Sequence, residues 1–180
     1  RTQTLLRIKT EEMERFFAVS LDLLCIADTD GRLLLVNKAW TDILGYSQQE
    51  LEKSKFLEFV HPDDLEPTLQ AIAILKEQKP LLNFTNRYRS KDGSYKYIEW
   101  RSHPSGSLIY ASGRDVTEKT EIAHELANSE QKFRRYTEKA PLSIFVTDLT
   151  GNFQLVNQAA CRLTGFSEAE LLRHSIIDIV

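Results

Sequence analysis

The sequence has few cysteines and no concentration of positive charge. Cys25 and Cys161 are the only two, and neither belongs to a CxxC or Cys/His cluster with metal-ligand spacing. Each lies in an apolar run, so we expect two buried free thiols in a reducing compartment, with no metal site. The 23 Lys and Arg residues are scattered among 26 Asp and Glu residues. Nucleic acid and anionic membranes are therefore not expected as main partners.

Long apolar runs are also missing. No run approaches the roughly 18–20 residues that a membrane span needs, and the N-terminus has no signal-peptide core. No Gly-rich nucleotide-binding motif occurs either. We expect a soluble, cytoplasmic segment without a membrane contact of its own, whose parent protein could still carry an anchor elsewhere.

An internal repeat is the strongest feature that is present. Residues 23–60 align without a gap with residues 143–180 at a constant offset of 120. Matched positions include the pairs Gly31 and Gly151, Asn37 and Asn157, Gly45 and Gly165, and Glu50 and Glu170. The second copy stops at Val180, the counterpart of Val60, while the first continues to about Thr117. We therefore expect a fragment of a longer protein, with a second domain that is truncated.

Turn and cap residues delimit the first elements of the complete copy. Asp28 and Gly31 lie in a short polar stretch between two apolar segments, which is typical of a hairpin turn. Asn37 then precedes a helical segment as an N-cap residue would, and Gly45 follows it as a C-cap glycine would. The sequence predicts a β-hairpin followed directly by a short helix.

A longer helix and three strands are predicted in the remainder of this copy. The helix begins near Pro62, with Pro67 in its first turn, and its buried face is expected to carry Leu65, Leu69 and Ile72. Three strands follow at residues 81–90, 94–103 and 107–116, with turns at "KDG" and "PSG". The predicted fold is α+β, a five-stranded antiparallel sheet with helices on one face, and a ligand could lie between the two layers.

Four motifs in this copy resemble the PAS sensory domains with their C-terminal PAC segment: "DTDGRLLLVNKAWTDILGYSQQEL", "FVHPDD", "RYRSKDGSYKYIEW" and "GRDVTE". The resemblance covers residues 15–117 and, in part, 135–180. It implies a non-enzymatic sensory segment. Such domains bind a small ligand or cofactor, or only dimerise, and act through flanking helices on a histidine kinase, a diguanylate cyclase or a similar output domain.

This resemblance suggests a division into four parts. An N-terminal helix is expected over residues 1–18, a PAS domain with its PAC segment over 19–117, a connecting signalling helix over 118–140, and the first part of a second PAS domain over 141–180. The output domain is expected to be a histidine kinase, with a diguanylate cyclase as the alternative. A ligand-free structural dimerisation scaffold is the alternative function.

The family's pocket implies candidate ligand contacts at Asn37, Trp40, Ile72, Tyr88 and Trp100. For Asn37 the alternative is a helix cap. For Trp40 it is core packing, since the second copy has Ala160 there. Alternation along the strand puts Trp100 on the same face as Ile98, and we assign that face to the interior.

The common cofactors of the family leave few traces in this sequence. The covalent flavin (FMN) subclass needs a cysteine in the region "GYSQQELEKSKF", which has none. Haem-binding members supply a histidine from the long helix or the next strand, and none occurs between Leu65 and Arg101. No cofactor is therefore expected, although non-covalent FAD stays open because "LGY" and "TGF" also occur in flavin-binding members.

Signal-relay residues are expected where the last strand meets the connecting helix. Asp115 and Thr117 match the family's Asp-x-Thr, with Asp115 holding the strand to the helix and the Thr117 hydroxyl capping it. Ile122, Leu126 and Phe133 then recur with the spacing of a coiled-coil seam, together with Ser129, Tyr136 and Ala140. Leu6, Met13 and Phe16 form a similar seam near the N-terminus. We expect a homodimer through these helices; the alternative is that each seam packs on its own domain.

His124 poses the one catalytic alternative, because "HEL" also begins the phosphoacceptor segment of sensor kinases. Those segments continue with a basic residue, Thr or Asn, and then Pro, whereas Ala127, Asn128 and Ser129 follow here. The heptad count places His124 opposite the seam. No catalytic residue is therefore expected in this segment.

Overall fold

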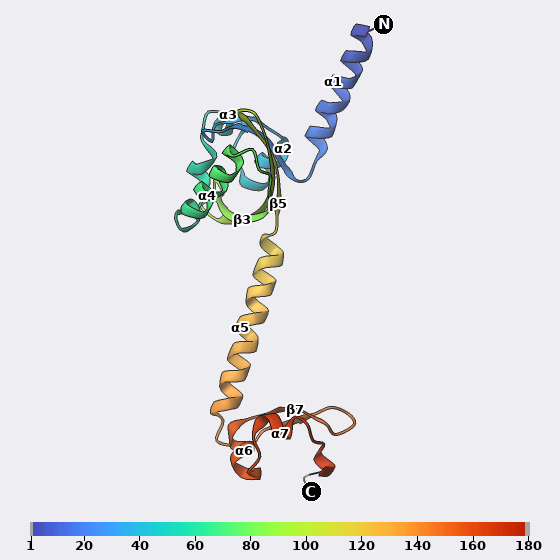
Figure 1. The fold of residues 1–180 in the computed structure, drawn as a ribbon, viewed down its shortest axis with the longest axis vertical. Helices are drawn as coiled ribbons and strands as arrows, with labels where there is room; N and C mark the ends of the chain where they lie inside the picture. The colour runs from blue at the N-terminus through green and yellow to red at the C-terminus, as the bar shows by residue number, and fades with distance from the viewer. Residues whose placement is uncertain (1, 179–180) are drawn as a thin grey trace. The chain divides into compact units, whose positions relative to one another are not determined.

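The computed structural model describes residues 2–178, and the side chains of residues 9–178. The chain forms two compact units that divide between Thr120 and Glu121 (Figure 1). Helix α1 (Thr2–Val19) precedes the sheet of the first unit, and the division falls within helix α5 (Thr117–Lys139). Both helices were expected from the sequence.

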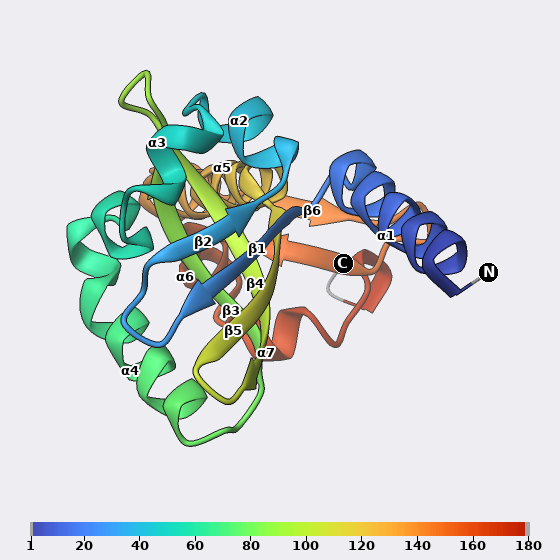
Figure 2. The ribbon, with the colours of Figure 1, turned by 90° about the horizontal axis from the view of Figure 1, so that it is seen from above.

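The first unit contains a five-stranded antiparallel sheet in the order β2-β1-β5-β4-β3, seen from above in Figure 2. The strands are β1 (Leu23–Asp28), β2 (Leu33–Val36), β3 (Leu81–Arg89), β4 (Tyr95–Ser105) and β5 (Leu108–Asp115). This arrangement confirms the predicted α+β fold. One boundary differs, because Pro104 lies within β4, opposite Ile109, rather than in a turn. The first residue of β3, Leu81, pairs with Ser102, so β3 does not extend to Pro104 and no neighbour on that side needs the N–H group that proline lacks.

Short helices follow the β1–β2 hairpin. They are α2 (Lys38–Leu44), α3 (Gln48–Glu52), η1 (Phe56–Phe59), η2 (Pro62–Asp64) and the longer α4 (Leu65–Lys76). Gly45 ends α2 with a φ of 81°, and its N–H donates to the carbonyl oxygen of Thr41, as a C-cap glycine does. Ser47 and Glu50 form a capping box at the start of α3.

The buried face of α4 differs from the predicted one. Thr68, Ala71, Ile72 and Leu75 are buried, whereas Leu69 is 53% exposed. Leu69 follows Thr68 by about 100° around the helix axis. The Thr68 side chain faces the sheet, where its hydroxyl accepts from Asn86 Nδ2, so Leu69 points away from the buried face. Pro67 is in the first turn, as expected, where its missing N–H costs nothing.

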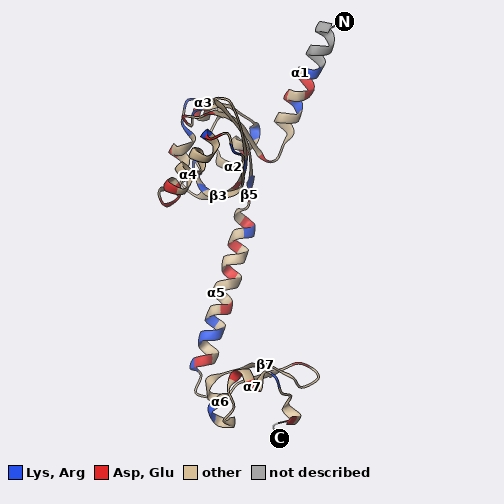
Figure 3. Ribbon diagram, in the orientation of Figure 1, with Lys and Arg blue, Asp and Glu red and all other residues tan. Residues whose placement is uncertain are grey.

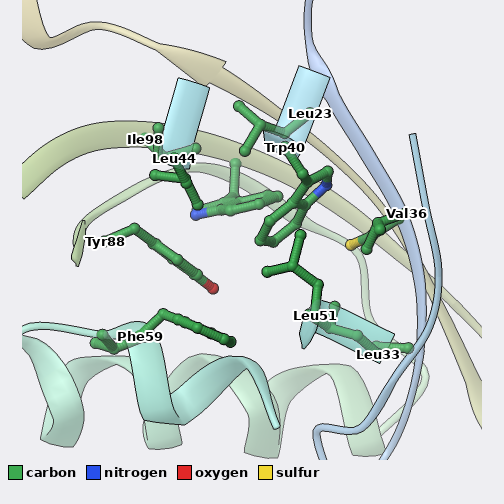
Figure 4. Packing of buried hydrophobic residues seen from close by; sticks show 13 residues of the cluster. Leu23, Leu33, Val36, Trp40, Leu44, Leu51, Phe59, Tyr88 and Ile98 are labelled. Atoms are coloured by element: carbon green, nitrogen blue, oxygen red, sulfur yellow. The ribbon is translucent and has the colours of Figure 1, made fainter. Parts of the chain in front are cut away.

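The core of the first unit lies between these helices and the inner face of the sheet. Its fully buried side chains include Leu23, Leu33, Trp40, Leu44, Leu51 and Ile98, shown in Figure 4. Trp100 lies on the same inner face as Ile98, as predicted, and is 5% exposed. Opposite Trp100 on β5 is Gly113, where an added Cβ would lie only 2.6 Å from the indole ring. A glycine is therefore needed for the indole to lie across this strand.

The second unit repeats the first elements of the fold. Its strands are β6 (Phe145–Thr147) and β7 (Phe153–Val156), followed by α6 (Gln158–Thr164), α7 (Glu168–Leu171) and η3 (Ile176–Asp178). Gly165 ends α6 with a φ of 81°, and Ser167 forms a capping box with Glu170. These are the counterparts of Gly45, Ser47 and Glu50, so the sequence repeat is also a structural repeat.

Candidate ligand cavity and helix junctions

A cavity of about 50 Å³ lies between α4 and the inner face of the sheet. Four of the predicted ligand contacts line it, namely Trp40, Ile72, Tyr88 and Trp100. They come from α2, α4, β3 and β4, so distant parts of the chain converge here. Asn37 does not line the cavity, and its role is different.

Three aromatic rings form one wall of the cavity. The ring centroid of Trp40 lies 5.9 Å from that of Tyr88 and 5.7 Å from that of Trp100, and the Tyr88 and Trp100 centroids are 5.4 Å apart. Figure 4 shows the side chains of Tyr88 and Trp40 converging on the same part of the core. Trp40 is fully buried and its Nε1 donates to the carbonyl oxygen of Leu24. It therefore belongs to the core and to the cavity wall at once.

A buried polar network crosses the cavity wall. Trp100 Nε1 donates to Asn86 Oδ1 at 2.9 Å, and Asn86 Nδ2 donates to Thr68 Oγ1 at 3.0 Å. Both Asn86 and Thr68 line the cavity and are 3% exposed. Neither was among the predicted contacts. Strand alternation offered a signal for Asn86, because it lies two residues before Tyr88 and so shares its face.

The ionisable groups in the cavity wall are held neutral. Burial raises the pKa of the Cys25 thiol to about 12. Burial also raises the pKa of Tyr88 well above its usual value, and a hydrogen bond with Asn86 opposes this only in part. No described side chain that lines the cavity belongs to Asp, Glu, Lys, Arg or His. The wall is therefore uncharged at neutral pH.

Both cysteines are free thiols; Cys25 is buried and Cys161 half-buried.

Asn37 joins the end of α1 to the sheet. Its Nδ2 donates to the carbonyl oxygens of Phe17 at 3.1 Å and Asp22 at 3.0 Å, and its Oδ1 accepts from Leu24 N at 2.9 Å. Although Asn37 occupies the N-cap position of α2, its side chain makes no cap hydrogen bond there. The predicted N-cap position of Asn37 is confirmed, but its side-chain amide binds the end of α1 and Asp22 instead of the N–H groups of α2. Asn37 is not among the residues that line the cavity.

The junction between β5 and α5 is held by Asp115, Thr117 and the backbone of Tyr97. The Thr117 hydroxyl donates to the Asp115 carboxylate and accepts from Tyr97 N at 2.9 Å, while Thr117 N donates to Asp115 Oδ1 at 2.9 Å. It is thus the Asp115 carboxylate, not the Thr117 hydroxyl as predicted, that satisfies the first N–H group of the helix. The Thr117 hydroxyl instead ties the start of α5 to β4.

The seam residues of the two helices are exposed. Ile122 and Leu126 are each 59% exposed and Phe133 is 55% exposed, while Met13 and Phe16 are both 71% exposed. The Leu6 side chain lies outside the described residues. Acidic residues predominate in the first half of α5 and basic ones in the second half (Figure 3). Glu118 in the first turn and Lys139 in the last turn have the charges that the helix dipole favours.

Comparisons with known proteins agree with this architecture. Family models described as the PAS fold match residues 33–112 and residues 131–180. A PAS domain of an HTR-like protein from Haloarcula marismortui is 24% identical, with a TM-score of 0.56 over 64% of this chain and 98% of that one. A domain of a sensor histidine kinase/response regulator from Geobacter sulfurreducens is 21% identical, with a TM-score of 0.55 over 61% and 96%. These two structures share the fold.

Two curated relatives are signalling enzymes. Sporulation kinase E of Bacillus subtilis is 25% identical over 89% of this chain and 22% of the relative, and the probable diguanylate cyclase DgcE of Escherichia coli is 26% identical over 67% and 11%. This chain thus spans less than a quarter of either relative.

The fold, the cavity and the helix junctions of the first unit define a sensory type of α+β domain, and the second unit repeats its first elements. The chain belongs to the PAS family. Among residues 2–178, no helix is long and apolar enough to cross a membrane. No group of three or more His, Cys, Asp or Glu residues in the same range could hold a metal ion.

Proposed function

We propose that the first unit senses a small molecule in the cavity beside α4, and that the flanking helices pass the change to an output domain. The observation that carries the proposal is the cavity, which is lined largely by core side chains of the unit. Protein interiors are close-packed, and an empty space forfeits contacts between its walls. A space retained beside Trp40, Tyr88 and Trp100 is therefore better explained by a bound molecule than by stability alone.

The path from the cavity to α5 is short. Ile109 and Ala111 of β5 line the cavity, and the same strand ends at Asp115, whose carboxylate binds the first residue of α5. A ligand that moves β5 against β4 would alter the hydrogen bond from Tyr97 N to Thr117 Oγ1. We propose that this junction is the output of the sensor, with Ile122, Leu126 and Phe133 as the relay surface.

The exposed seams support a parallel homodimer. Large apolar side chains recur at heptad spacing on α5, and in the single chain they are exposed to solvent. Pairing with a second copy would bury them, and each apolar side chain so buried contributes about 1.5–3 kcal/mol. Dimerisation through α1 and α5 is therefore part of the proposal.

The proposed output domain is a histidine kinase in the same chain, supported by the similarity to sporulation kinase E over most of this segment. A diguanylate cyclase is the second candidate, supported by the similarity to DgcE. Activity assays on the full-length protein distinguish a histidine kinase from a diguanylate cyclase. Incubation with labelled ATP should give a phosphohistidine outside residues 1–180. Conversion of GTP to a cyclic dinucleotide would identify a cyclase, and label on His124 would place the catalytic site in this segment.

No flavin or haem is part of the proposal, since about 50 Å³ is room for only a few water-sized groups. The free thiols support a cytoplasmic location. Native mass spectrometry of the purified chain tests the sensor function. We expect a small-molecule adduct and no visible absorption. A chain that binds nothing, and whose amide exchange at Tyr97 never responds to added metabolites, would instead be a ligand-free dimerisation scaffold.

A further inference from the structure

We infer that the cavity selects a neutral molecule of about three to five non-hydrogen atoms with one hydrogen-bonding group, and that Asn86 recognises this group. The inference rests on the proposed function of the cavity as a sensor site. It adds the chemical class of the ligand and the residue that determines specificity.

The uncharged side chains that line the cavity indicate that the ligand is neutral. A buried charge needs a counter-charge or several hydrogen bonds, and otherwise its transfer from water is very unfavourable. No described lining residue supplies a counter-charge, and the Cys25 thiol and the Tyr88 phenol are held in their neutral forms. A carboxylate, phosphate or ammonium group would therefore be rejected.

The size of the ligand follows from the volume. One buried water molecule needs about 10–15 Å³ of cavity volume. A cavity of about 50 Å³ therefore holds roughly three to five non-hydrogen atoms or water-sized groups. Most of the surrounding side chains are apolar, including Leu33, Ile72 and Leu75. The ligand should therefore have a short apolar part that these side chains can cover.

The hydrogen-bonding group of the ligand is expected at Asn86. A carboxamide has two N–H donors and two acceptor lone pairs, and the bonds to Trp100 and Thr68 use one of each. A ligand amide or hydroxyl that reaches Asn86 therefore finds the second N–H donor and the second lone pair of the same carboxamide. The other buried polar side chain of the wall on the sheet, Ser102, lies farther along β4, beyond Trp100.

Asn86 also connects the cavity to the first turn of α4. Its partner Thr68 donates to the carbonyl oxygen of Asp64 at 2.6 Å. The Asp64 carboxylate in turn binds Arg87, the residue after Asn86, through Nε at 2.9 Å and through the backbone N at 2.8 Å. A ligand that competes with Thr68 for Asn86 therefore acts on the contact that holds α4 to β3.

Two-dimensional NMR of the full chain tests this inference. The sequence contains two tryptophans, and both line the cavity, so two indole N–H signals report on it. Three probes of small size are compared: propionamide, its charged isostere propionate, and the apolar atom xenon. We expect saturable binding of propionamide, with a larger shift for Trp100, whose Nε1 is bonded to Asn86, than for Trp40, whose Nε1 is bonded to Leu24.

Variants locate the site and the recognising residue. Ala71→Leu fills the cavity from α4 and should abolish propionamide binding, while Ala73→Leu on the exposed side of the same helix should leave it unchanged. Asn86→Leu should weaken it by about three- to tenfold through the lost hydrogen bond. If Asn86→Leu does not fold, the three probes on the unmodified chain still test whether the ligand must be neutral and whether it must form a hydrogen bond near Trp100.

The outcomes are distinct. Propionate binding as well as propionamide would overturn the neutral class, and xenon shifting the Trp100 signal as strongly as propionamide at saturation would overturn the need for a hydrogen bond. Unchanged affinity in Asn86→Leu would overturn the role of Asn86. In these three cases the cavity still binds a molecule, so the proposed sensor function stands. Failure of all three probes to enter would overturn the inference and count against the sensor function as well.

Discussion

Asn37 donates a hydrogen bond from Nδ2 to the carbonyl oxygen of Phe17, and Asn157 makes the same bond to Thr137, each reaching back twenty residues. Phe17 and Thr137 lie in the last turn of α1 and α5, where backbone carbonyl groups have no partner within the helix. In both units the Oδ1 atom accepts from the first strand region, at Leu24 N and Ile144 N. One asparagine per unit therefore joins the incoming helix to the sheet.

Removing this amide should loosen the helix and destabilise the unit. Asn37→Ala leaves Leu24 N and several carbonyl groups without their partner, and we expect a loss of about 2–3 kcal/mol in the free energy of unfolding. Urea unfolding followed by tryptophan fluorescence reports on the first unit, which contains Trp40 and Trp100. Asn128→Ala, exposed on α5, is the matched control and should change little. Equal stability of the two variants would contradict the role of Asn37.

Gly113→Ala should disturb the aromatic wall of the cavity. The new Cβ would meet Trp100 at 2.6 Å and Ile98 at 2.7 Å, so the indole ring must move. We expect a destabilisation of about 1–3 kcal/mol, as for other overpacked cores, and a shifted Trp100 indole signal by NMR. The neighbouring Ser112→Ala does not add volume and should leave this signal in place. A Trp100 signal unchanged in Gly113→Ala would show that the ring does not lie against this strand.

Thr117→Val should weaken the junction between β4 and α5. Valine has the shape of threonine without its hydroxyl, so Tyr97 N loses its acceptor at a cost of about 1–3 kcal/mol. Hydrogen exchange should become faster at the Tyr97 amide. Thr120→Val is the control, because the Thr120 hydroxyl donates to the carbonyl oxygen of Val116, four residues earlier at the start of the same helix, and so makes a local bond. Slow exchange at Tyr97 in Thr117→Val would argue against this contact.

The ion pair between Asp64 and Arg87 predicts a dependence on pH. Hydrogen bonds from the Arg87 guanidinium, opposed in part by burial, hold the pKa of Asp64 below its usual value. A depressed pKa stabilises the folded state above the unfolded pKa, near 3.9, and this contribution is lost as the pH falls through the folded pKa. Urea unfolding from pH 7 down to pH 3 should show a smaller loss of stability for Asp64→Asn than for the parent. Equal slopes would contradict the coupling.

Leu126→Glu should weaken the proposed dimer. A charge in the seam of a coiled coil cannot be buried without a partner, so we expect the dimer dissociation constant to rise by more than about tenfold. Sedimentation velocity over a range of concentrations measures this constant. Asn128→Glu places the same charge off the seam and should dimerise like the parent, as should His124→Ala. A parent chain that is monomeric at all concentrations would remove dimerisation from the proposal.

The sequence by itself determined the local structure and the repeat. The hairpin turn at Asp28 to Gly31, the C-cap glycines Gly45 and Gly165, and the alternation that turns Trp100 inward all depend on neighbouring residues. Because these preferences act over a few residues, they can be recognised without knowledge of the fold.

Only the tertiary structure decided which side chains meet across long distances in the chain. The Asn37 side chain binds the last turn of α1 and Asp22 although the residue stands at the N-cap position of α2, and Thr117 binds the backbone of β4. The contact of Asn86 with Thr68 and Trp100 joins three elements, and α4 buries Thr68 where the sequence pattern predicts Leu69. A polar side chain can satisfy its hydrogen bonds with many partners, and the choice among them depends on which atoms the packed core brings within reach.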